Sequence, residues 1–140
     1  MWHCVLYFSV LSWLPSLWSL GMNEVRSHHD LKVWQKAMDM TVSIYELTKF
    51  FPREELYRMT SQMTRSAASV PANIAEGHAR GTRKDYANFL AIAKGSLMET
   101  ETFLLLAIRL NYISQSQAQV TLNLITEISK MLTSLRKNLL

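Results

Sequence analysis

Residues 82–110, TRKDYANFLAIAKGSLMETETFLLLAIRL, carry the pattern that decides the fold. Their apolar side chains recur mainly at steps of three and four, the spacing that places them along one face of an α-helix. These side chains are Tyr86, Phe89, Leu90, Ala93, Leu97, Leu104, Ala107 and Ile108. Thr82, with Asp85 three residues later, resembles a capping box, which predicts the start of the helix. We expect one long helix that ends near Leu110.

Three further segments show the same period. The first stripe is Leu31, Trp34, Ala37, Met38, Thr41, Ile44, Tyr45 and Thr48, the second is Leu56, Met59, Met63, Ala67, Val70 and Ile74, and the last is Thr121, Leu124, Ile128, Met131 and Leu135. Asp30 is placed to cap the first helix, and Pro52 should end it, because the residue before a proline is pushed out of the α region. We expect the second helix to open near residues 53–55 and Ser114 with Gln117 to cap the fourth.

These four helices predict an all-α fold. Their connections are short, so sequential helices must run antiparallel, which gives an up-down-up-down four-helix bundle. A chain of 140 residues with only 4 glycines and 3 prolines has room for one compact core and few of the turn-formers that an all-β chain needs. We assign the bundle to one domain, residues 30–138, and expect residues 22–29 to form a disordered leader.

Residues 1–21 differ in kind from the rest. They contain no Lys, Arg, Asp or Glu but hold three of the four tryptophans. A secretory signal would have a positive start, and a transmembrane anchor would have about 20 unbroken apolar residues, whereas serines and Pro15 interrupt this run. We favour a third interpretation, in which translation begins at Met22 and residues 1–21 are an over-extended reading frame. The single cysteine, Cys4, cannot form an internal disulfide, and we expect a cytoplasmic protein without a membrane segment.

Pro71 lies inside the second stripe, where it removes one backbone hydrogen bond and should kink the helix unless the break is itself used. Polar residues accompany it: Arg65, Ser66, Ser69, Asn73 and Glu76. Two interpretations are open. The serines can allow close helix approach while Asn73 satisfies carbonyls that the proline frees, or the polar ridge, with Glu76, can face another subunit and fix how protomers align.

The chain lacks the residue patterns of a catalytic or metal site. A di-iron bundle needs Glu-x-x-His pairs on two helices, and no such pair occurs. Glu76 and His78 are two residues apart and do not share a helical face. His28 and His29 precede the first helix and are interpreted as a solvated pair. We predict no enzymatic activity, no cofactor and no metal.

The net charge of +4 favours an acidic partner. Basic residues gather at the start of the third helix and near the end of the fourth: Arg80, Arg83 and Lys84, and Lys130, Arg136 and Lys137. An up-down bundle places these two groups at the same end, where they could form one phosphate-binding surface. The alternative is a solvated cap, stabilised in the fourth helix by the helix dipole.

Several strings resemble the four-helix bundle proteins encoded in intervening sequences of bacterial 23S ribosomal RNA genes, which are often labelled ribosomal-protein-like. They are DLKVWQKA at residues 30–37, SVPANIAEG at residues 69–77, and, in the third helix, Tyr86, Phe89, Leu90, GSL at residues 95–97 and Glu99. The second string, with Ser69, Pro71, Asn73, Glu76 and Gly77, is the most specific. Members of that family usually start a few residues before the first string, which agrees with a start at Met22.

The resemblance implies a ring-shaped homopentamer. A similar bundle serves as the accessory protein of diversity-generating retroelements, where it binds a reverse transcriptase and nucleic acid. We therefore expect a non-enzymatic oligomeric scaffold that contacts RNA, or an RNA-processing protein, through its basic end. The alternative is a purely structural protein-protein interaction module. Salt-dependent retention of RNA discriminates between them, because phosphate contacts weaken steeply as salt rises.

Overall fold

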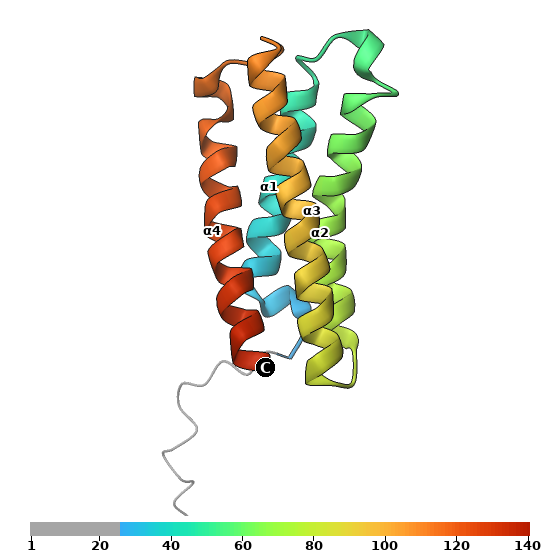
Figure 1. The fold of residues 1–140 in the computed structure, drawn as a ribbon, viewed down its shortest axis with the longest axis vertical. Coiled ribbons are helices and arrows are strands. Elements are labelled where there is room, and N and C mark those ends of the chain that lie inside the picture. Colours follow the sequence, from blue (N-terminus) through green and yellow to red (C-terminus); the bar gives the residue numbers. More distant parts are fainter. Residues whose placement is uncertain (1–25) are drawn as a thin grey trace, which may run out of the picture.

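The computed structural model describes residues 26–140, and this part of the chain forms four long helices (Figure 1). They are α1 (Lys32–Thr48), α2 (Met59–Ala79), α3 (Arg83–Arg109) and α4 (Gln115–Leu139), with single 3-10 turns η1 (His28–Asp30) and η2 (Arg53–Glu55). No strand occurs between residues 26 and 140, which confirms the all-α prediction. The expected extension at residues 1–21 and the first part of the expected leader, residues 22–25, lie outside the described residues.

The four helices occupy the corners of a square in chain order. Helix α1 packs on α2, α2 on α3, α3 on α4, and α4 back on α1, whereas among the described residues no Cα atoms of the diagonal pairs lie within 8 Å of each other. Figure 1 shows the connections at residues 49–58 and 110–114 together, and we call this the upper end. The connection at residues 80–82 and the C-terminus lie at the opposite, lower end. Neighbouring helices therefore run antiparallel.

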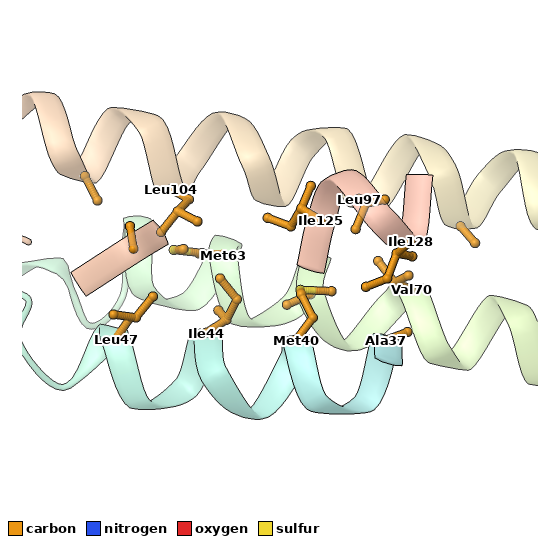
Figure 2. Close-up of a cluster of buried hydrophobic side chains, with 14 of the residues drawn as sticks. Ala37, Met40, Ile44, Leu47, Met63, Val70, Leu97, Leu104, Ile125 and Ile128 are labelled. Carbon is orange, nitrogen blue, oxygen red and sulfur yellow. The ribbon is translucent and has the colours of Figure 1, made fainter. Parts of the chain in front are cut away.

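The core is a column of aliphatic and methionine side chains contributed by all four helices (Figure 2). Its largest fully buried members are Met40, Ile44, Met63, Val70, Ile74, Leu90, Leu97, Leu104, Ile125, Ile128 and Leu132. Full burial of each such side chain contributes about 1.5–3 kcal/mol. No helix between residues 26 and 140 has the length and apolar character needed to cross a membrane.

The start of α1 differs from the prediction. Asp30 does not cap α1: its carboxylate accepts hydrogen bonds from the backbone N–H groups of Arg26 and Ser27, both at 3.0 Å, and completes a capping box around η1. Leu31 occupies the N-cap of α1 without a side-chain bond. Residues 28 and 29 of the expected leader therefore belong to the turn η1.

Helix α2 begins later than predicted. Residues 53–55 form only the turn η2, and α2 starts at Met59. Because the α-helical period does not extend back through the turn, Leu56 is 54% exposed instead of buried. Tyr45, also assigned to the core from the sequence, is 51% exposed.

In α4 the buried stripe is rotated by about one residue from the predicted one. Ile125 and Leu132 are buried, as are the predicted Thr121 and Ile128. The remaining predicted members, Leu124, Met131 and Leu135, are only partly buried. Met131 and Leu135 line the seam with α1 beside Leu31 and Val33. Helix α4 therefore carries two adjacent rows of apolar side chains, because it packs against both α1 and α3.

The register of α4 can be tested by comparing two truncations. Ile125→Ala should lower the free energy of unfolding by about 2–5 kcal/mol, because it leaves a cavity in the core. Leu124→Ala should cost only about 1 kcal/mol, because that side chain is half-buried. Urea denaturation followed by circular dichroism measures both losses. Equal losses, or a larger loss at Leu124, would mean that the predicted stripe is the real core.

Candidate interaction surfaces

The SVPANIAEG string, residues 69–77, lies in α2, and most of its side chains are buried or half-buried against the neighbouring helices. The Ser66 hydroxyl of α2 is 2.9 Å from that of Thr100 in α3, and the Ser69 hydroxyl is 3.0 Å from that of Ser96. Asn73 Nδ2 donates to the carbonyl and to the hydroxyl oxygen of Ser69 at 2.8 and 2.9 Å. The hydroxyl side chains form a row between α2 and α3, which we call the hydroxyl seam: Ser66, Ser69, Ser96 and Thr100. Small side chains let the two backbones approach closely.

Gly77 lies where α2 approaches α3 closely. A Cβ atom at this position would lie 2.6 Å from Cβ of Phe89 and 2.9 Å from Cδ2 of Tyr86, so no larger residue fits without movement. The α2–α3 pair is also the most extensively packed pair in the bundle. Burial raises the pKa of the Tyr86 phenol, whose hydroxyl has no hydrogen-bond partner among the described residues. The glycine of the string is therefore explained by packing within one chain.

Pro71 is buried, and α2 continues through it to Ala79. The carbonyl that lacks its partner is that of Ala67, four residues earlier. Thr41 Oγ1 of α1 lies 3.0 Å from this carbonyl oxygen and 2.8 Å from the carbonyl oxygen of Ala37, so its single proton is shared between the two. The prediction that Asn73 satisfies the freed carbonyl is wrong, because Asn73 binds Ser69.

Two of the six residues assigned to a subunit interface reach the surface. Arg65 is exposed and lines a polar groove of about 290 Å³ between α2 and α3, together with Ser69, Ser96 and Glu99. Glu76 is exposed and forms an ion pair with Arg80 at 2.5 Å. The others, Ser69, Pro71, Asn73 and Gly77, are buried or half-buried within the bundle. A role of this set in subunit contacts stays a prediction.

Two of the predicted basic residues, Arg83 and Arg136, join the start of α3 to the end of α4. The Arg83 guanidinium donates to the carbonyl oxygens of Asn138 at 2.6 Å and Leu139 at 3.3 Å. In the opposite direction, Arg136 Nε donates to the carbonyl oxygen of Ala87 at 3.2 Å. Backbone carbonyls at a helix C-terminus are partners that a cation satisfies well. These bonds join the two helix ends at the lower end of the bundle.

The six basic residues therefore divide into two groups. Arg80, Arg83 and Arg136 are engaged within the chain, and Arg80 also lies 4.8 Å from the centre of the Phe89 ring. Lys84, Lys130 and Lys137 are exposed and make no ion pair with any residue from 26 to 140. Lys130 lies about 14 Å from the end of α4, because each helical residue rises about 1.5 Å. Only the lysines have free ammonium groups to offer a phosphate.

The histidines are not a freely solvated pair. His28 and His29 pack edge-on against Trp34, with ring centroids 5.2 and 5.0 Å from its ring. The pKa of His28 is lowered by partial burial and by the nearby His29 and His78. His78 in turn packs against Tyr86 at 5.8 Å. The region from 26 to 140 holds no group of three side chains placed to bind a metal ion.

Two exposed apolar surfaces at the upper end were missed from the sequence. One is formed by Tyr45, Leu56 and Tyr57, and the other by leucines on the outer face of α3, Leu105, Leu106 and Leu110. A signal for the second was present, because residues 102, 105, 106, 109 and 110 have helical spacing of their own. Of the six residues in these two surfaces, only Tyr45 and Leu56 belong to the stripes predicted for the core.

Comparisons with known proteins point to one family. The profile of a family described as 23S rRNA-intervening sequence protein matches residues 29–134. The chain is 39% identical to a protein of unknown function from the S23 ribosomal protein family of Bacteroides thetaiotaomicron, whose crystal structure superposes with a TM-score of 0.70. The match covers 75% of this chain and 98% of that chain. No curated protein matches the sequence.

Two glycines provide a matched test of the α2–α3 packing. Gly77→Ala should destabilise the bundle by about 1–3 kcal/mol, because the added methyl group collides with Phe89. Gly95→Ala, in α3, should stabilise it by up to about 1 kcal/mol, because a Cβ there meets nothing within 4 Å and alanine favours helix. Thermal melts of the two variants should shift in opposite directions. A neutral Gly77→Ala would remove the packing explanation.

Proposed function

This chain belongs to the 23S rRNA-intervening sequence protein family, and we propose that it acts as a non-enzymatic, self-assembling scaffold that binds RNA at the lower end of its bundle. The observation that carries the proposal is the exposed set of Lys84, Lys130 and Lys137 beside helix ends that Arg83 and Arg136 hold together. Ammonium groups displayed on a fixed backbone bind phosphates in a sequence-independent way.

The basic end is well suited to an extended polyanion. Lys130 and Lys137 are seven residues apart and therefore share one face of α4, along which they are separated by about 10 Å. Lys84 lies at the start of α3, where the adjacent Arg83 binds the end of α4. A nucleic-acid backbone presents phosphates along its length and can contact all three side chains, whereas a small anion cannot.

RNA is the partner to test first, because the family takes its name from segments of 23S rRNA genes. We place the protein in the cytoplasm, where ribosomal RNA is processed, and propose that it assembles into a homo-oligomer, the pentamer that its resemblance implies. The second candidate is a module that binds only protein. The observation in its favour is that three of the six basic residues already have partners within the chain.

Reversal of two exposed charges tests the RNA contact. Lys84→Glu with Lys137→Glu should weaken binding to a labelled 23S rRNA fragment and leave the helices intact, because neither side chain is engaged within the bundle. Loss of two phosphate contacts should reduce the slope of log K against log salt by roughly 1.4–1.8 units. Fluorescence anisotropy between low and moderate salt measures both affinity and slope.

A variant with the same change in net charge serves as the control. Arg53→Glu with Arg58→Glu alters exposed residues at the upper end and should leave the slope unchanged. If the wild-type protein shows no binding at low salt, or if both double variants behave alike, the protein-only module becomes the better explanation.

A further inference from the structure

An open apolar groove lies between the end of α1 and the start of α2, at the upper end of the bundle. It has a volume of about 660 Å³. Tyr45, Leu56 and Tyr57 line it and are 51%, 54% and 90% exposed. Much of the remaining lining consists of small hydroxyl side chains, among them Thr60 and Thr64. We call this surface the α1–α2 groove. Large apolar side chains gathered in one exposed place mark an interaction site.

The second apolar surface lies on α3. Leu105, Leu106 and Leu110 are 44%, 40% and 46% exposed, although α3 buries its other stripe in the core. Thr102 and Arg109 flank them at helical spacing, so the five side chains follow one outer face of the helix. We call this surface the α3 patch.

The two surfaces lie at the same height but face different directions. Both are at the upper end, because α1 and α3 end there and α2 begins there (Figure 1). Helices α1 and α3 are a diagonal pair, and among the described residues none of their Cα atoms lie within 8 Å of each other. The groove on the α1 side and the patch on the outer face of α3 therefore cannot meet within one chain. A second copy, rotated about an axis parallel to the bundle, brings its patch level with the groove of the first.

We propose that the α1–α2 groove of one copy binds the α3 patch of the next, and that this heterologous contact builds the assembly. The inference rests on the self-assembly in the proposed function and names the surfaces that produce it. Each copy carries one groove and one patch, so every copy receives one neighbour and inserts into another. Contacts of this kind generate a ring when the rotation closes.

Charge supports a second copy as the occupant. Arg109 in the α3 patch makes no ion pair with any residue from 26 to 140. Glu46 lines the groove and pairs only with Lys49, 2.6 Å away on the same helix, where both side chains are largely exposed. A carboxylate on one surface and an unpaired guanidinium on the other are complementary. Lys49 also lines the groove and lies beside Glu46, so contact between the two surfaces would bury no isolated charge.

Two single variants of the full chain test the contact. Tyr45→Glu places a carboxylate in the groove, and Leu106→Glu places one on the patch. Each variant alone should sediment as a monomer of 16.1 kDa, because one of its two surfaces is blocked. An equal mixture should form a one-to-one dimer and nothing larger, since one intact groove meets one intact patch and the remaining surfaces are both blocked. Sedimentation velocity resolves these species.

The control is Val120→Glu, which alters an exposed residue of α4 at the same end but in neither surface; it should assemble like the wild type. Circular dichroism should show all three variants folded. If the wild-type protein is itself a monomer, self-assembly and this inference both fail. If the wild type assembles but Tyr45→Glu and Leu106→Glu assemble equally well, or their mixture gives no dimer, only the assignment of these surfaces is overturned.

Discussion

The close contact of α2 with α3 is the constraint on which the rest of the bundle depends. Gly77 leaves no space for a Cβ atom against Phe89, and the hydroxyl seam lets the helices stay near one another further along. With this pair held together, α1 and α4 close the square by packing on one member each and on one another. The most specific string of the family therefore contributes an intramolecular contact through Ser69 and Gly77.

Much of the fold could be predicted from the sequence, because apolar spacing and capping signals are local. The side chains of Thr82 and Ser114 accept hydrogen bonds at the starts of α3 and α4, as expected. The misplaced starts of α1 and α2 have a common cause. In both places a 3-10 turn takes up the residues whose chemistry suits a helix start, and the helix begins after it. Whether such residues form a 3-10 turn or the first turn of an α-helix depends on tertiary packing, which the local sequence does not reveal.

The candidate sites were predicted less completely. The convergence of the start of α3 with the end of α4 followed from an up-down topology. That Arg83 and Arg136 bind backbone carbonyls was not visible, because these partners lie on the opposite helix and far away in the sequence. The exposed leucines of α3 were not identified for another reason: residue type alone does not distinguish a side chain that faces the core from one that faces outward.

The proline of α2 has an evolutionary consequence. As long as position 71 lacks an N–H group, the carbonyl of Ala67 depends on the hydroxyl of Thr41 in the adjacent helix. A residue with an N–H group at position 71 would restore the intrahelical bond and free position 41. The two positions, 30 residues apart in the sequence, should therefore covary: lineages that lose the proline can drift to valine or alanine at position 41, and lineages that keep it should retain a hydroxyl there.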